Sequence, residues 1–192
     1  MFRRMTRERY LSDAELESFM AAVRSRRHVN RPRDHALFAL LANTGMRPSE
    51  VRALTRGDLH LDRRHPRVML HRARKKYGPA PLAHLVLNRA VADVVARFVT
   101  TLPGDHGVRL FPFTKRQSAR LFHYYAGKAG IRPGRKVFSL RHTVGMRLWR
   151  HTHDLRLMQA VMGHTNQAAT AGYAHTPPEA IREAYLAAGV AG

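Results

Sequence analysis

The sequence contains no cysteine among its 192 residues, which excludes disulfides, thiolate metal sites and a thiol nucleophile. Long apolar runs are also missing. The longest, ALFALLA at residues 36–42, is far shorter than the roughly 20 residues of a membrane-spanning helix. The first ten residues, MFRRMTRERY, carry charge but lack the apolar stretch of a secretory signal. These absences favour a cytoplasmic protein with no membrane partner.

Acidic residues are scarce too. The chain has 13 Asp and Glu against 34 Lys and Arg, so its formal net charge is +21. Its hydrophobic fraction of 44% is that of a globular protein, so this charge must lie on a folded surface. Such an excess indicates a polyanionic partner, and double-stranded DNA is the leading choice, whereas RNA binding has only the charge to support it. Because the basic residues are spread along the chain, a single membrane-surface helix is disfavoured.

Capping signals and helical periodicity predict a mainly α-helical domain. Ser12 and Glu15 form a capping box before an amphipathic helix, and Pro32 begins a second helix that extends to about residue 43. Residues 67–87 are typical of two strands around a basic turn. Further helix starts are predicted at Asn88, Thr114, Ser139, Asp154, Asn166 and Thr176. The expected fold class is therefore mainly α with a small antiparallel β-sheet.

Tyr173 has unusual neighbours. It lies in MGHTNQAATAGYAHT, residues 162–176, among small side chains and nine residues after His164. A tyrosine in a protein core normally has bulky neighbours, whereas small ones allow another molecule to approach closely. We therefore consider Tyr173 and His164 as parts of a site.

Basic side chains occupy three other places suited to a phosphate. Arg47 lies in TGMRPSE, residues 44–50, a predicted turn that leads into a short helix. Arg141 lies in SLRHT at a predicted helix N-terminus, a position that favours anions. Lys75 and Lys76 lie at the predicted hairpin tip, from which they could reach into a DNA groove.

Together these residues could act on a DNA phosphodiester. Its transition state carries extra charge on the non-bridging oxygens, and two guanidinium groups match that geometry. A nucleophile and an acid are also needed. Without cysteine or an evident carboxylate cluster for magnesium, a hydroxyl nucleophile remains, and tyrosine, with a pKa of about 10, is a good leaving group. Each of these side chains, taken alone, is more often solvated or structural than catalytic, so the prediction of a site depends on their combined spacing.

In order along the chain, the segments resemble the tyrosine recombinase (phage integrase) family. TGMRPSEVRALTRGDL is similar to its first arginine segment, FSLRHTVGMRL to its second, and MGHTNQAATAGYAHT to its segment from Gly-His to tyrosine. YLSDAELESFMAAV is similar to the start of its catalytic domain. The resemblance covers nearly the whole chain. It implies the family's catalytic-domain fold and a site-specific recombinase that uses no metal and no other cofactor.

The resemblance also implies roles for individual residues. Tyr173 would attack the scissile phosphate and form a 3′-phosphotyrosine, which frees a 5′-hydroxyl. Arg47 and Arg141 would clamp the non-bridging oxygens, and His164 would donate a hydrogen bond to the same phosphate.

Two further roles fall on the hairpin and on the first arginine segment. A hairpin lysine would protonate the leaving 5′-oxygen. KKYG matches the family pattern better at Lys76 than at Lys75, and either lysine could instead contact a phosphate. Glu50, three residues after Arg47, matches the acidic position that orients the set.

Position 138 departs from the family. Phe138 stands where a histidine usually precedes the second arginine by three residues, and phenylalanine can neither donate nor accept a proton. Either the site works in a weakened form, or His142 substitutes, or catalysis is impaired. We expect retained activity, and we interpret His142 as a structural histidine.

The predicted organisation has three parts. Residues 1–11 form a basic lead-in, residues 12–176 the catalytic domain, and residues 177–192 a C-terminal helix and tail. That tail could dock on a neighbouring protomer, as the family's last helix often does, or pack on its own domain. Starting at the catalytic domain, the sequence is either an excised fragment or a short form similar to the recombinases that invert fimbrial switches. The resemblance implies a dimer or tetramer on DNA, in the nucleoid.

Two other functions stay open. A type IB topoisomerase-like enzyme would use the same chemistry to relax supercoils, and a non-catalytic DNA-binding regulator derived from a recombinase would explain Phe138. A metal site is disfavoured. His151 and His153 in RHTHD are joined by no cysteine or carboxylate at a ligand spacing, so we interpret them as surface residues.

Overall fold

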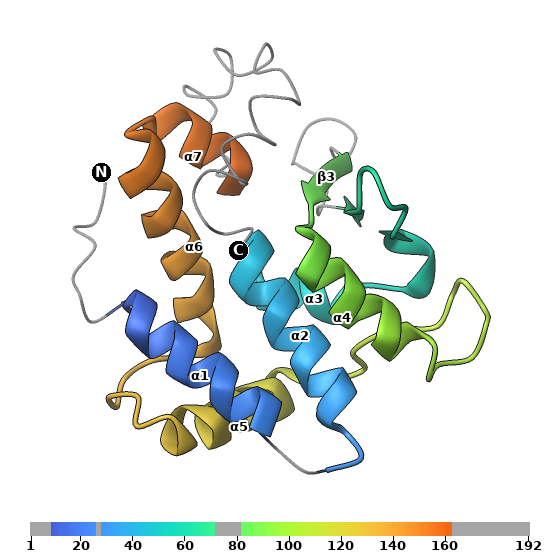
Figure 1. Cartoon of the computed structure of the whole chain (residues 1–192), viewed down its shortest axis with the longest axis horizontal. Helices are drawn as coiled ribbons and strands as arrows, with labels where there is room; N and C mark the ends of the chain where they lie inside the picture. The colour runs from blue at the N-terminus through green and yellow to red at the C-terminus, as the bar shows by residue number, and fades with distance from the viewer. Residues whose placement is uncertain (1–8, 26–27, 72–81, 163–192) are drawn as a thin grey trace.

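The computed structural model describes residues 9–25, 28–71 and 82–162, and this part of the chain is mainly helical with a small antiparallel sheet, as predicted (Figure 1). Its elements are α1 (Asp13–Ser25), α2 (Arg31–Thr44), α3 (Pro48–Ala53), a 3₁₀ turn η1 (Arg56–Asp58), β1 (Leu59–His60), β2 (Arg67–His71), β3 (Leu82–Val86), α4 (Arg89–Val99), α5 (Lys115–Lys128), α6 (Val137–Thr152) and α7 (Leu155–Met162).

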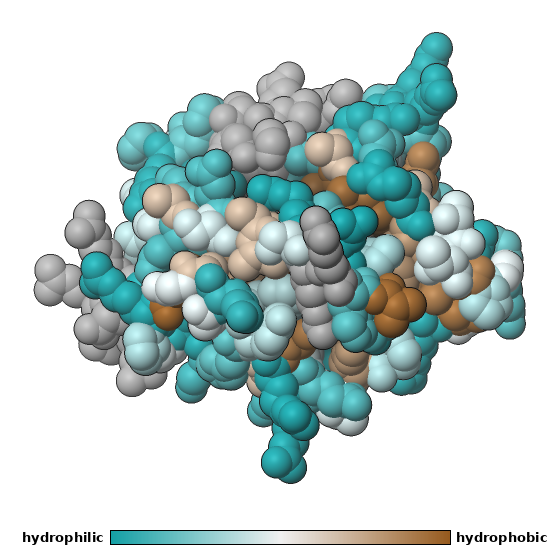
Figure 2. Space-filling model, turned by 60° about the horizontal axis from the view of Figure 1, so that its bottom comes forward, coloured by the Kyte–Doolittle hydropathy of each residue, from teal (hydrophilic) through white to brown (hydrophobic). Residues whose placement is uncertain are grey.

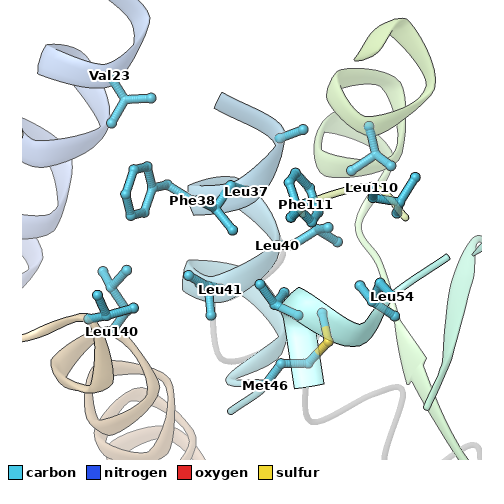
Figure 3. Packing of buried hydrophobic residues seen from close by; sticks show 14 of the residues in the cluster. Val23, Leu37, Phe38, Leu40, Leu41, Met46, Leu54, Leu110, Phe111 and Leu140 are labelled. Carbon is cyan, nitrogen blue, oxygen red and sulfur yellow. The ribbon is translucent and has the colours of Figure 1, made fainter. Parts of the chain in front are cut away.

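Helix α2 lies at the centre of the fold. It contacts α1, α4 and α6, and Figure 1 shows it between α1 and α4. Residues 36–41 of this helix are all buried, because α1, α4 and α6 cover it from different sides. In Figure 3, Phe38 and Leu41 point toward the side of Val23 and Leu140, whereas Leu40 points toward Phe111. The segment without a polar face is therefore the core around which the other helices pack.

Three predicted helix starts are confirmed by their capping bonds. The backbone N–H of Glu15 donates to the hydroxyl of Ser12 at 3.1 Å, and the Ser12 N–H donates to the Glu15 carboxylate at 2.8 Å. Thr114 and Gln117 make the same reciprocal pair before α5. Asn88 accepts from the Val91 N–H at 2.6 Å. Each bond satisfies an N–H that the helix itself leaves without a partner.

The predicted start of α6 is wrong. We expected Ser139 to cap this helix, but α6 begins at Val137 and its N-cap is Lys136. The Ser139 hydroxyl accepts from the Lys136 N–H at 3.1 Å, so serine takes the place that Glu or Gln has in a capping box. Arg141 consequently lies in the second turn of α6 and not at its N-terminus.

Helix α7 begins as predicted. The carboxylate of Asp154 accepts from the Leu157 N–H at 3.0 Å, which caps the first turn. The predicted helices after Asn166 and Thr176 lie outside the described residues, and so do the hairpin tip and its two lysines.

The sheet has the order β1-β2-β3, and both pairs are antiparallel. Val68 faces Leu85 across β2 and β3, and both side chains are buried together with Leu70. Apolar residues thus alternate along β2 and turn one face of the sheet to the core.

Two hydrophobic clusters hold the helices together. The large one joins α1, α2, α4 and α5 with the sheet and the start of α6. A separate small one packs α7 on α6, and it consists of Val144, Leu148, Met158, Val161 and Met162.

The face shown in Figure 2 is mostly hydrophilic with small, scattered apolar patches. None of the described helices has the length and apolar character needed to cross a membrane.

Candidate active site

Arg47 stands at the first residue of the turn-to-helix junction that the sequence predicted. It is the N-cap of α3 and has extended backbone angles, while Pro48 occupies the first turn. Glu50 holds it in two ways. One carboxylate oxygen accepts from the Arg47 backbone N–H at 2.6 Å, and the other accepts from the guanidinium Nη1 at 2.8 Å. The side chain of Glu50 is 11% exposed and that of Arg47 is 34% exposed. The guanidinium is therefore oriented by Glu50 and partly exposed to solvent.

Arg141 is buried, with 3% of its surface exposed. Its Nη1 donates to the carbonyl oxygen of Gly45 at 2.6 Å, and its Nη2 donates to the carbonyl oxygen of Met162. A buried guanidinium needs such acceptors, because its desolvation is otherwise costly. Two of the five N–H groups of an arginine thus fix the plane of the guanidinium.

Gly45 brings the two arginines to one place. It ends α2 in the left-handed conformation, with φ 65°, and its N–H bonds back to the Leu41 carbonyl. Its own carbonyl accepts from Arg141, and Arg47 follows two residues later. One turn therefore positions both arginines. The Gly45–Arg141 contact was not foreseen, although a glycine directly after an apolar helix is a known C-cap signal.

Phe138 and His142 lie one helical turn apart on α6. Their ring centroids are 4.9 Å apart and the planes meet at 74°, an edge-to-face contact. Phe138 is 42% exposed, and His142 is half-buried beside it. The aromatic residue that departs from the family pattern thus stands on the surface, three residues from the buried Arg141.

The remaining candidates lie outside the described residues. These are Lys75, Lys76, His164 and Tyr173. The described part of the chain ends at Met162, whose carbonyl accepts from Arg141 and which directly precedes Gly163 and His164 in sequence. Sequence reasoning gave no role to Met162, and no local pattern marks it.

The N-terminus of α1 is tied to the helix that carries Arg141. The Leu11 N–H donates to the Thr143 hydroxyl at 2.9 Å, and the Asp13 carboxylate accepts from Arg147 at 2.7 Å. Both contacts join segments more than 130 residues apart. They link the start of α1 to α6 at positions two and six residues beyond Arg141.

The histidines of RHTHD are placed at the end of α6. His151 and His153 are both exposed, and His153 is the C-cap with φ 50°. Within residues 9–25, 28–71 and 82–162, no three His, Asp or Glu side chains gather in a way that could hold a metal ion.

A model described as the phage integrase family matches residues 9–179. The chain belongs to the phage integrase family. The resemblance seen in the motifs is thereby confirmed, and the match covers the first arginine segment, the second one and Tyr173.

Relatives in this family are tyrosine recombinases. The chain is 29% identical over 150 residues to tyrosine recombinase XerC of Neisseria meningitidis, which is 73% of this chain and 47% of the relative. It is 27% identical over 180 residues to tyrosine recombinase XerD of Pseudomonas putida, which is 90% of this chain and 59% of the relative. The chain therefore spans about half the length of these phage integrase family members.

Solved structures show the same fold. The XerH site-specific recombinase bound to its difH substrate matches with a TM-score of 0.72 at 21% identity, over 93% of this chain and 53% of that chain. The XerA recombinase matches with a TM-score of 0.65 at 25% identity, over 92% of this chain and 63% of that one. The predicted tyrosine recombinase catalytic-domain fold is confirmed.

Proposed function

We propose that this chain supplies the catalytic domain of a site-specific DNA recombinase, which breaks and rejoins DNA through a 3′-phosphotyrosine. The observation that carries the proposal is the shared anchoring of two arginines. Arg141 donates to the carbonyl of Gly45, and Arg47, two residues after Gly45, donates to the carboxylate of Glu50. Two guanidinium groups anchored at one turn gather positive charge there, which favours a phosphate.

The reaction has a simple balance. The phenol oxygen of Tyr173 bonds to phosphorus, the bond from phosphorus to the 5′-oxygen breaks, and the phenol proton passes to water. Lys76, or Lys75 beside it, gives a proton to the leaving 5′-oxygen. His164 donates a hydrogen bond to the same phosphate. Because the phosphate ester energy is kept in the phosphotyrosine, the reverse attack by a 5′-hydroxyl reseals the strand.

The proposed partner is double-stranded DNA. A formal net charge of +21 on a folded domain favours it, because basic side chains release the counterions of the phosphate backbone. The likeness to an XerH recombinase with its difH substrate, and to a Tn1549 transposon integrase in complex with circular intermediate DNA, supports this partner. We further propose that the protein self-associates as a dimer or tetramer on DNA, in the nucleoid.

One observation favours a second candidate function. Phe138 is exposed next to the arginine site and offers the phosphate no hydrogen bond. A DNA-binding regulator derived from a recombinase would keep the arginines for phosphate contacts and lose cleavage. A type IB topoisomerase-like activity would keep cleavage but not pair two sites.

A plasmid assay separates the three functions. Negatively supercoiled plasmid would carry two copies of a segment of the DNA that flanks the gene, and products would be resolved on gels. Deletion or inversion between the copies supports the recombinase. Relaxation that is independent of the two copies would assign the topoisomerase-like activity. Specific binding without any cleavage would assign the regulator.

A further inference from the structure

Met162 occupies a notch formed by two glycines. A Cβ atom placed on Gly45 would lie 3.2 Å from the Met162 Sδ and 3.1 Å from the Val144 Cγ1, and one placed on Gly145 would lie 3.4 Å from the Met162 Cε. Gly45 ends α2 and Gly145 lies within α6, so the thioether side chain fills space that both backbones leave free. Only 3% of Met162 is exposed.

The backbone of the same residue bonds to the arginine site. The Met162 carbonyl oxygen accepts from Nη2 of Arg141, and Nη1 of Arg141 donates to the carbonyl of Gly45. Met162 and Arg141 therefore both touch Gly45, one by side-chain packing and the other by a hydrogen bond. A shift of the Met162 side chain in its notch would move the carbonyl that Arg141 uses.

We propose that Met162 is a positioning residue, whose packing between Gly45 and Gly145 sets the orientation of Arg141. The proposal rests on the function proposed above, since it assigns Met162 a share in placing the arginine that clamps the phosphate. It also makes Met162 the link between Arg141 and the segment that begins with Gly163 and His164 in the sequence.

The way α7 packs supports this role. Its buried side chains Met158, Val161 and Met162 belong to the small cluster with Val144 and Leu148, apart from the large core. Met162 is the member of this cluster whose carbonyl accepts from Arg141, so its packing bears directly on the arginine. Methionine is unbranched and adapts to an irregular gap, which suits a notch between two backbones.

Met158 gives a matched control. It lies on the same helix in the same cluster and is 9% exposed, but its atoms are not among those nearest to a Cβ on either glycine. The rate of covalent adduct formation would be measured at saturating nicked duplex DNA for Met162→Ala and Met158→Ala. We expect at least a tenfold lower rate for Met162→Ala and a rate within twofold of wild type for Met158→Ala. Equal rates for the two variants would overturn the proposal.

Gly145 offers a second test that leaves Met162 in place. Gly145→Ala would put a methyl group in ordinary contact with Met162, whereas Gly145→Leu would push the thioether out of the notch. We expect Gly145→Ala to cleave at the wild-type rate and Gly145→Leu to lose at least tenfold. Restoration of the rate by Met162→Ala in the Gly145→Leu background would strengthen the assignment, because the leucine then fills the vacated space. Cleavage by Gly145→Leu at the wild-type rate would contradict it.

A spectroscopic readout keeps this proposal separate from the proposed function. Nitrogen-15 spectra of the arginine side chains, with the Arg141 signals assigned by their loss in Arg141→Lys, report how fast the guanidinium rotates. We expect restrained Nη signals in wild type and Met158→Ala and averaged signals in Met162→Ala. Averaging in both variants or in neither would overturn the positioning role. Restrained signals in a protein that forms no adduct would reject the recombinase and leave the positioning role intact.

Discussion

The guanidinium of Arg141 lies 2.6 Å from the carbonyl oxygen of Gly45, although the two residues are 96 positions apart in sequence. This contact joins α6 to the turn between α2 and α3, from which Arg47 projects. The two arginines that the motifs identified separately are therefore parts of one structural unit. Disturbing either segment should affect the other.

Replacement of Arg141 by lysine tests that unit. A single ammonium group cannot donate to the Gly45 and Met162 carbonyls in the planar geometry of a guanidinium. We expect the free energy of unfolding to fall by about 2 kcal/mol, the scale of a buried hydrogen bond to a charged group. Cleavage should fall at least a hundredfold. Urea unfolding and adduct formation measure the two effects, and wild-type values for both would contradict the account.

Glu50→Gln tests how Arg47 is oriented. The amide keeps the shape of the side chain but is uncharged and has one acceptor oxygen where the carboxylate has two, so it cannot accept from both the Arg47 N–H and the guanidinium. We expect stability to change by less than about 1 kcal/mol, because the pair is partly exposed, while cleavage falls about tenfold. Glu17→Gln on the exposed surface of α1 is the control and should cleave like wild type. Equal rates for both variants would show that Glu50 has no orienting role.

Phe138→His tests the departure from the family pattern. An imidazole at this exposed position of α6 adds a hydrogen-bond donor close to Arg141. We expect cleavage to rise several-fold, and the gain to be largest below the histidine pKa of about 6.5, where both ring nitrogens carry protons. Phe138→Leu should show no such gain. A histidine variant no faster than the leucine variant across this pH range would argue that the position lies away from the phosphate.

His35 predicts part of the pH dependence of stability. Burial, followed by the charges of Arg24, Arg97 and Arg31, holds the pKa of this α2 histidine below its usual value of 6.5. The unfolded chain therefore binds a proton more readily than the folded one. The contribution of His35 to stability is complete above the unfolded pKa and is lost as the pH falls through the lower folded pKa. Urea midpoints should drop less on acidification for His35→Gln than for wild type, while a matching drop would refute the assignment.

Much of the fold could be predicted from local sequence. Ser12, Asn88 and Thr114 each cap a helix through a bond to a residue three positions ahead, so the pattern and the contact lie in the same short stretch. The prediction for Ser139 was wrong because this serine is the third residue of the helix, where its hydroxyl accepts from the N–H of the N-cap residue Lys136. The sequence pattern alone does not distinguish this position from the N-cap itself.

The anchoring of the site could not be predicted in this way. Arg141 was expected at a helix N-terminus, open to an anion, and is instead buried against two backbone carbonyls. Carbonyl acceptors are common to every residue, so Gly45 and Met162 carry no side-chain signal for this role. Only the packing of α2, α6 and α7 brings them to Arg141. The roles of Lys76, Lys75, His164 and Tyr173 stay predictions.

Covalent trapping tests the central claim most directly. Wild type and Tyr173→Phe would be incubated with nicked suicide duplexes from the DNA that flanks the gene, and denaturing gels would reveal any protein–DNA adduct. The account predicts an adduct with wild type, joined to the 3′-phosphate through Tyr173, and none with Tyr173→Phe. Specific binding of the same duplexes by both proteins without any adduct would contradict it.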